Sequence, residues 1–440
     1  MGVTAGASYT DNTFLTISPN EIDDIVWRVS PYLTVSHITP NFDANLNYRL
    51  YWFRFADLKR TTNYHTGVGS LTGKFWQNAL NLEVGARRSQ VLSNPTQAIP
   101  AGRLQLGSNL ADRNEIYANP RLNKPLGRST SLIADYRITE RSYADSLIQE
   151  DTNHLGILEL NNYRAGQGLT WALRYNWRRS EFEISAPWEY QTVGAELGFW
   201  TNAKTRLFAS GGKESDILQP FDPALEDTFW EVGVAHNAGE NLNFELAAGE
   251  RTFGTSWRGN IAYTFRRGNT TFTYTETPTT PGLGLARNRS IFDIDGITDF
   301  VNQPGSAQRF LSSRLQWGLN LNFRRTGLAL TVFDEDRSDR ITPTGLPLDD
   351  QSQRGAKLNF TWRAGARTTF GANGSIVRRE IDSANKSELS TAGFSVEYQL
   401  GARSSVALAY SYNEAEPLGL AVNNQNYVAN VVSLLFTVTN

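Results

Sequence analysis

The chain has 440 residues, 42 Lys+Arg against 44 Asp+Glu, and no cysteine. The near-neutral charge gives no general attraction to nucleic acid, and the lack of cysteine excludes disulfides, thiolate metal sites and cysteine catalysis. Aromatic residues make up 12% of the chain, yet its mean hydropathy is −0.41. This combination is typical of a barrel whose outer face meets lipid and whose inner face meets water.

From residue 41 onward, apolar and polar side chains alternate at every step in one segment after another. Residues 169–177 alternate Leu, Trp and Tyr with Thr, Ala, Arg and Asn, and residues 315–323 follow the same rule. A period of two predicts strands with one apolar and one polar face. No run approaches the roughly 18 consecutive apolar residues of a transmembrane helix. A sandwich or solenoid that buries the same stripes is the alternative to a barrel.

Short and longer connections alternate along the chain. The short ones are rich in Gly or Asn, which accept positive φ in tight hairpins. With an opening strand near 2–12 and a closing one near 425–438, we predict an all-β fold, a single large antiparallel up-and-down transmembrane barrel. It should have about 22 strands, within a range of roughly 18 to 26. Residues 1–440 would form one outer-membrane domain without a plug or soluble domain. The short turns lie near 39–40, 77–78, 126–127, 165–167, 202–203, 237–239, 268–269, 325–327, 364–366 and 401–402.

The longer connections collect Pro, Gly, Asp and Ser and should lie on the extracellular side. An even number of strands then leaves both termini periplasmic, in the outer membrane of a Gram-negative bacterium. Met1 has no apolar leader behind it, so we expect a mature chain whose signal peptide has been removed. The longest connection, near 278–305, could fold inward as a constriction or outward as a cap. The connections are 12–22, 90–113, 141–152, 213–226, 278–305, 334–351 and 413–423.

Polar side chains opposite the apolar stripes should face the lumen and form the path of a solute. Asn, Gln and Arg beside Tyr or Trp can hydrogen-bond hydroxyl groups and stack on sugar rings, although a wet, internally satisfied wall would look the same. Most of the 42 Lys+Arg residues are arginine, which suits contact with carboxylates and phosphates but also ion pairing across the wall. The candidates are Asn45, Asn47, Arg49, Asp135, Arg137, Arg174, Asn176, Arg178, Arg258, Asn260, Arg314, Gln316, Asn320, Lys357, Asn359 and Arg363.

Motifs of catalysis are missing from the sequence. The four histidines are scattered singly, and neither a HExxH element nor a G-x-S-x-G elbow occurs. We therefore predict no enzyme, no catalytic residue and no cofactor. Asp293, Asp295 and Asp299 form a weak metal candidate that lacks the later bidentate Glu of a calcium loop, and an ordinary solvated turn is the simpler interpretation.

A barrel of this size has a wide lumen, which must be an open path or be filled. Strand-like sequence begins by Val3, so we expect a channel without a plug. The predicted function is export of an exopolysaccharide across the outer membrane. The expected partners are outer-membrane lipid, lipopolysaccharide, the polysaccharide chain and periplasmic export proteins. Two alternatives stay open: a general or substrate-specific porin for small hydrophilic solutes, and a structural barrel that is plugged by, or scaffolds, a partner protein.

The N-terminal region carries a resemblance to a known family. Residues 8–12 (Ser-Tyr-Thr-Asp-Asn), 25–31 (Ile-Val-Trp-Arg-Val-Ser-Pro) and 46–48 (Leu-Asn-Tyr) are the matching motifs. On these the chain resembles the outer-membrane β-barrels associated with the PEP-CTERM system, which are encoded beside exopolysaccharide genes. The resemblance covers about the first fifty residues and implies a role in exporting or assembling an extracellular polysaccharide. The family offers no catalytic residues to carry over.

Overall fold

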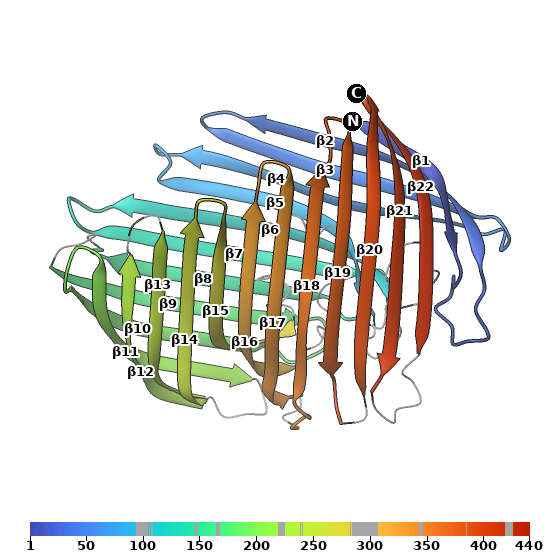
Figure 1. The fold of residues 1–440 in the computed structure, drawn as a ribbon. Helices are drawn as coiled ribbons and strands as arrows, with labels where there is room; N and C mark the ends of the chain where they lie inside the picture. Colours follow the sequence, from blue (N-terminus) through green and yellow to red (C-terminus); the bar gives the residue numbers. More distant parts are fainter. Residues whose placement is uncertain are drawn as a thin grey trace.

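The computed structural model describes residues 1–93, 104, 106, 109–145, 148–163, 168–218, 225–237, 239, 241–281, 283, 307–342, 346–383, 385–418 and 426–440. In them the chain forms one antiparallel sheet of 22 strands. The first strand, β1 (Gly2–Thr10), pairs with β2 (Asp24–Ile38) on one side and with β22 (Tyr427–Thr439) on the other. The sheet therefore closes into a barrel (Figure 1), which confirms the predicted fold and strand number.

Each of the other strands pairs with the strands before and after it in the sequence. They are β3 (Phe42–Phe55), β4 (Thr61–Phe75), β5 (Leu80–Leu92), β6 (Leu110–Pro125), β7 (Ser131–Tyr143), β8 (Asp151–Asn161), β9 (Leu169–Phe182), β10 (Trp188–Trp200), β11 (Thr205–Leu218), β12 (Leu225–Asn237), β13 (Leu242–Arg251), β14 (Gly254–Phe265), β15 (Gly268–Thr279), β16 (Arg309–Asn322), β17 (Thr326–Ile341), β18 (Gln351–Arg363), β19 (Thr368–Glu380), β20 (Lys386–Gly401) and β21 (Ser404–Pro417).

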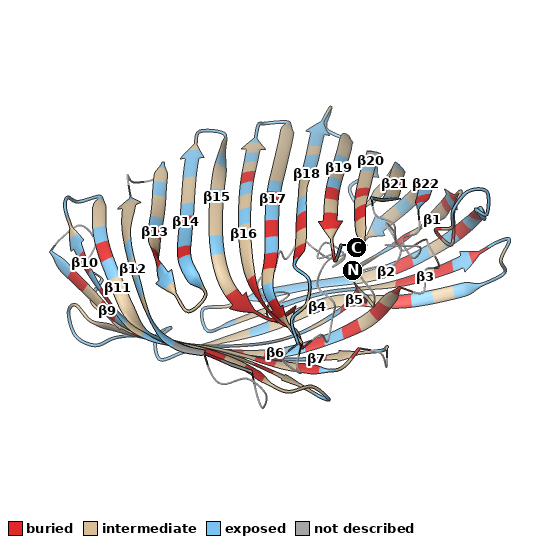
Figure 2. Cartoon of the chain, turned by 90° about the horizontal axis from the view of Figure 1, so that it is seen from below, coloured by how far each residue is buried: buried red, intermediate tan, exposed pale blue. Residues whose placement is uncertain are grey.

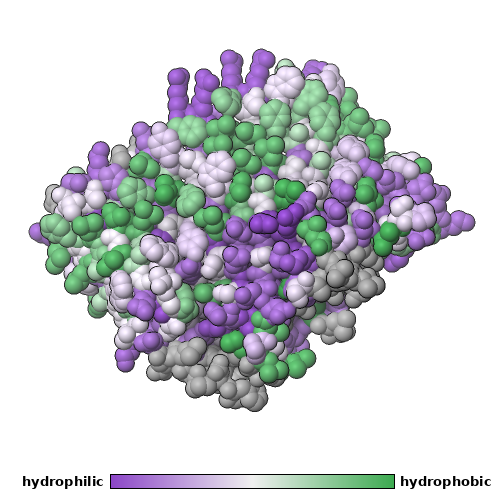
Figure 3. Space-filling view, turned by 60° about the horizontal axis from the view of Figure 1, so that its bottom comes forward, coloured by the Kyte–Doolittle hydropathy of each residue, from purple (hydrophilic) through white to green (hydrophobic). Residues whose placement is uncertain are grey.

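Alternation along each strand separates an apolar outer face from a polar inner face. On β9, Leu169, Leu173 and Tyr175 are exposed on the outer face, whereas Thr170 and Ala172 between them are buried. In Figure 3, hydrophobic side chains gather in patches over the wall, and hydrophilic ones lie over the middle of the view and along its edges. The division between the two faces of the strands is the one that a lipid-facing belt and a wet lumen require. Among the described residues, no helix is long and apolar enough to cross a membrane.

The two termini lie side by side at one end of the barrel (Figure 1), where the backbone N–H of Asn440 donates to the carbonyl of Met1 at 2.9 Å. The short connections lie at this end, which we call the turn end; the opposite end is the loop end. Between β4 and β5, Trp76, Gln77 and Asn78 all have positive φ, as a tight hairpin requires. The short turn predicted there is confirmed.

Some connections differ from the prediction. Gly268 and Thr326 were expected in turns but already begin β15 and β17, so these turns lie at 266–267 and 323–325. At the loop end the strands run further than expected, and residues 334–341, predicted as part of a loop, belong to β17. The link between β13 and β14 is a two-residue loop-end turn at 252–253 that we did not expect. For β15 and β17, pairing with the neighbouring strand continues past the residues that had suggested a break.

Burial along the inner wall is uneven. In Figure 2 the buried residues gather toward the loop ends of the strands, as on β15, β16 and β19. Phe53 and Phe55 near the loop end of β3 are buried, whereas Asn45 and Asn47 toward the turn end of the same strand are exposed. The loop-end half of the lumen is thus packed with protein, and the turn-end half of its wall is open to water.

Candidate functional site: the inner wall

All the candidate path residues lie on the inner face of the wall, and none of them is buried. Strand register brings several of them together. Asn176 on β9 lies opposite Thr192 of β10 and donates to its hydroxyl at 2.9 Å, and Asn320 on β16 donates to Asn269 at 3.1 Å. Lys357 and Asn359 share one face of β18 with Arg363 at the turn end. The structure thus places these residues on the inner face, and their part in a solute path stays a prediction.

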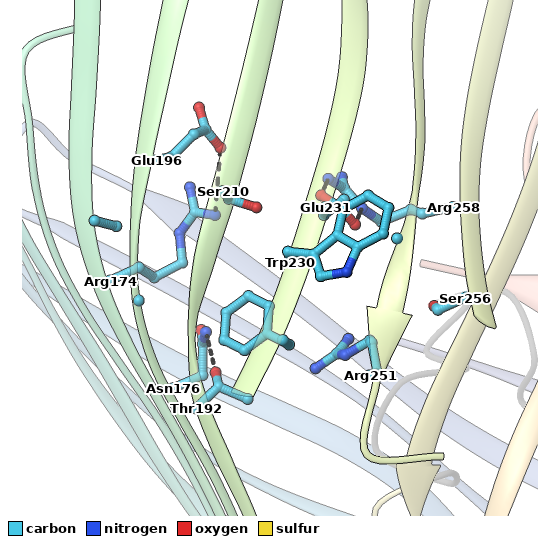
Figure 4. A pocket seen from close by; sticks show the side chains of 14 residues that line it. Arg174, Asn176, Thr192, Glu196, Ser210, Trp230, Glu231, Arg251, Ser256 and Arg258 are labelled. Carbon is cyan, nitrogen blue, oxygen red and sulfur yellow. Dashed lines mark hydrogen bonds and ion pairs between the residues drawn. The ribbon is translucent and has the colours of Figure 1, made fainter. Parts of the chain in front are cut away.

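A hollow of about 160 Å³, open on one side, lies in the inner wall between β9 and β14. Figure 4 shows its side chains, with Asn176 beside Thr192 and Glu231 beside Arg258. Two glycines line the hollow: a Cβ on Gly249 would lie 1.9 Å from a backbone oxygen of β12, and one on Gly194 would lie 2.9 Å from the Phe229 ring. A larger side chain at either position would displace the wall.

Three arginines project into this hollow, and each is held by carboxylates. Arg174 donates to Glu159 at 2.7 Å, and Arg251 donates to Glu214 at 2.6 Å. Arg258 pairs with both Glu231 and Glu245. Such bonds fix the direction of each guanidinium and balance its charge. The lining therefore offers both donors and acceptors, together with the aromatic face of Phe229, and has no strong excess of either charge.

The turn-end edge of the hollow contains a tyrosine that the sequence did not single out. The Tyr163 hydroxyl accepts from Arg174 at 3.0 Å and donates to Glu196 at 3.3 Å. Partial burial, followed by the charge of Glu196, raises the pKa of Tyr163 to about 12. The phenol therefore stays neutral at physiological pH and links the arginine to the carboxylate.

Other inner arginines stack on aromatic rings. The guanidinium carbon of Arg137 lies 3.8 Å from the centre of the Tyr117 ring, and that of Arg49 lies 4.9 Å from the Tyr32 ring. Arg178 donates to the carbonyl of Pro278 at 3.4 Å. These contacts leave planar, partly exposed groups along the wall, which suit contact with hydroxylated solutes.

At the loop end, the chain narrows the lumen. The connection after β15 folds inward at its start: Thr280 is buried and hydrogen-bonds Ser180 of β9 at 2.9 Å. Leu283 packs against Trp188 and Tyr190 of β10. The 278–305 connection therefore begins as a constriction; most of it lies outside the described residues.

Direct contacts also cross the lumen at the loop end. Arg309 of β16 donates to Asp216 of β11 at 2.8 Å, and both side chains are buried. Leu110, which begins β6, packs against Phe333 and Val377 of β17 and β19, half the circumference away. The sequence did not single out any of these residues as functional. One local pattern in the sequence does indicate packing inside the lumen. In residues 50–53, Leu-Tyr-Trp-Phe, both faces of the strand are apolar.

The predicted metal residues Asp293, Asp295 and Asp299 lie outside the described residues. Within the part of the chain that the structure describes, no group of three or more His, Cys, Asp or Glu side chains could hold a metal ion.

No family model and no curated protein matches the chain. Among solved structures, the barrel is similar to a variant of the ferric enterobactin receptor PfeA from Pseudomonas aeruginosa in complex with enterobactin, with TM-score 0.51 and 11% identity over 99% of this chain and 81% of that one. A double variant of that receptor gives TM-score 0.50 and 11% identity over 99% and 80%. The siderophore receptor PirA from Acinetobacter baumannii gives TM-score 0.49 and 9% identity over 99% and 80%.

At these identities the likeness shows the fold alone, that of a large closed β-barrel. The prediction of an exopolysaccharide export channel is wrong, because the similar barrels are ferric enterobactin receptors and not exporters. The polysaccharide chain predicted as a partner is withdrawn with it. The similar barrels are receptors, and the expectation that this chain is not an enzyme agrees with that likeness of fold. The resemblance to the PEP-CTERM-associated barrels is not tested by these matches and stays a prediction.

Proposed function

We propose that the chain is an outer-membrane transporter for small hydrophilic solutes, with a constricted lumen, a single barrel domain and both termini periplasmic. One contrast supports this: the turn-end half of the inner wall is polar and exposed, whereas the described contacts narrow the loop-end half. A purely structural barrel would have no need of a wet polar wall that ends at a constriction. A wide open pore would not have contacts such as Asp216–Arg309 across its lumen.

The charge balance of the hollow suggests the class of solute. Its arginines are each paired with carboxylates, so a strongly anionic or cationic solute gains little there. Hydroxyl groups both donate and accept, and the Phe229 ring offers an apolar face. Neutral polyhydroxylated solutes of monosaccharide or disaccharide size fit this lining, and many weak contacts of this kind allow both capture and release.

The test uses the refolded full chain in planar bilayers and in liposomes that swell as a solute enters. We expect the unchanged protein to have a small conductance and to admit neutral monosaccharides at least as fast as sugar acids of similar size. Leu283→Asp should raise the conductance severalfold, because a charge cannot remain packed against Trp188 and Tyr190. Leu346→Asp is the matched control, since Leu346 is an exposed leucine at the same end.

Equal conductance in the two variants would contradict the constriction. Selective entry of sugar acids would contradict the proposed solute class. If neither the protein nor Leu283→Asp admitted any solute, the transporter proposal itself would be wrong.

A further inference from the structure

A second hollow lies on the outer face of the barrel. It is a groove of about 550 Å³, open on one side, over β15 to β20. Pockets that hold small molecules have volumes of about 300–1,000 Å³, so the groove is large enough for part of a lipid. The part of the groove nearer the turn end is lined by residues of the apolar face: Phe272, Trp317, Val332 and Ile376. The small side chain of Ala356 lies between Val332 and Ile376.

Next to these apolar residues, on their loop-end side, lies one row of charged side chains. Strand register places Asp334 opposite Arg354, Arg354 opposite Arg378, and Arg378 opposite Glu388. The groove therefore has charged groups on its loop-end side and apolar groups toward the middle of the wall. A lipid lying in the membrane has its headgroup and acyl chains in this same order.

The two arginines in the middle of the row are directly opposite each other on neighbouring strands. Like charges in this position repel and destabilise a sheet. Arg354 is exposed and makes no hydrogen bond or ion pair with the described residues. Arg378 pairs with Glu388 at 2.9 Å, but its Nε atom is buried without a hydrogen-bond partner. The pair thus lacks a group that would accept from both guanidiniums.

A phosphate monoester supplies that group, because its oxygens accept from two guanidinium forks at once. The carboxylates of Asp334 and Glu388 flank the pair and leave the phosphate one favourable position, between the arginines. An acyl chain of the same molecule would then cover the apolar residues beside Ala356 and remove their surface from water.

We propose that this groove binds one molecule of lipid A, the phosphorylated and acylated anchor of lipopolysaccharide. The choice of lipid A over a phospholipid rests on the proposed function, which places the loop end in the outer leaflet. The groove and the arginine pair stand independently of any transport through the lumen.

The test is native mass spectrometry of the refolded full chain in detergent with bisphosphorylated lipid A. We expect one retained lipid A per barrel. Arg354→Gln/Arg378→Gln should weaken retention by about tenfold or more, because it removes the charge-assisted hydrogen bonds from both guanidiniums to the phosphate. Ala356→Trp should weaken it comparably by filling the groove while keeping both charges.

The matched control is Arg88→Gln/Arg179→Gln. It also removes two outer-face arginines near the loop end, but these pair with Asp112 and with Glu181 and Glu189 away from the groove. It should retain lipid A as the unchanged protein does.

Full retention by both groove variants, or a loss as large in the control, would overturn the site. Retention of phosphatidylglycerol equal to that of lipid A in competition would overturn the choice of lipid. Lipid binding is read without conductance, so a barrel that retains lipid A but passes no solute would contradict the transporter alone.

Discussion

The buried charge network around Arg141 gives the sharpest stability prediction. Arg141 on β7 donates to Glu115 of β6 at 3.1 Å and to Asp151 of β8 at 2.8 Å, and its side chain is 0% exposed. Arg141→Met would remove the guanidinium that both carboxylates share, so that the neutral side chains of Tyr143 and Asn153 still donate to the buried Asp151, while Arg113 stays near Glu115. Breaking a buried pair in this way costs about 3–5 kcal/mol, whereas replacing all of its members by neutral groups is often tolerated. We therefore expect Arg141→Met to lower the free energy of unfolding by about 3–5 kcal/mol.

The measurement is urea unfolding of the refolded barrel in lipid vesicles, followed by tryptophan fluorescence and by electrophoretic mobility without heating. Arg141→Met/Glu115→Gln/Asp151→Asn should recover most of the loss. Arg258→Met is the control, because Arg258 also pairs with two carboxylates but is 42% exposed, so its loss should be about 0–1 kcal/mol. A loss below about 1 kcal/mol for Arg141→Met, or a triple variant as unstable as the single one, would refute the reasoning.

Three further predictions concern other parts of the barrel. Gly249→Val should destabilise the barrel by about 1–3 kcal/mol in the same urea assay, while Gly365→Ala, where nothing lies within 4 Å, should cost far less. On the lipid-facing side, Leu408→Arg should lower the free energy of unfolding by about 2–4 kcal/mol if Leu408 lies near the bilayer midplane. Ser411→Arg, on the inner face, should lower it much less, and equal losses would contradict the assigned faces. Because the pKa of Tyr163 is about 12 in the folded chain against an ordinary value of 10.0, its contribution to stability is present below pH 10 and is lost as pH rises toward 12. Tyr163→Phe should flatten that part of the pH profile of unfolding, and an unchanged profile would show that the phenol is not linked to folding.

The sequence was sufficient to assign faces. A period of two fixes the side of every residue in a strand once one of them is placed, so Arg174 and Asn176 could be assigned to the lumen without knowing their partners. The same rule places Trp200 on the inner face. It follows Phe199 by one step, lies opposite Arg206 and shares that residue's inner face.

Strand ends were harder to predict, because backbone pairing decides them and not composition alone. Gly268 and Asn269 are turn-forming residues, yet both pair with β16, and the turn falls on the two arginines before them. At the loop end, Asp334 and Asp336 suggested a loop but pair with Arg354 and Ser352 of β18. Polar residues are tolerated there because that part of the strand lies beside headgroups or water and not hydrocarbon.

One family-like motif also has a structural role that its sequence alone does not reveal. Asp11 accepts from the backbone N–H of Asn430 at 2.7 Å, and Asn12 is fully buried and donates to the carbonyl of Val428 at 3.0 Å. Both residues therefore attach the connection after β1 to β22, where the barrel closes. A closure contact joins residues from the two ends of the chain, so no local pattern could have indicated it.

The contacts across the lumen could not be predicted for the same reason. Asp216 and Arg309, or Leu110 and Phe333, come together only because the closed sheet brings distant strands face to face across a flattened lumen. What the sequence does contain is a change in the inner face along a strand, from Asn45 and Asn47 to aromatic residues at its loop end. Inner residues at the turn end are exposed and replaceable, whereas those at the loop end are packed like the core of a soluble protein. Under the proposed function, solute passage depends on contacts that also stabilise the barrel, so variants that open the path should be among those that weaken the fold.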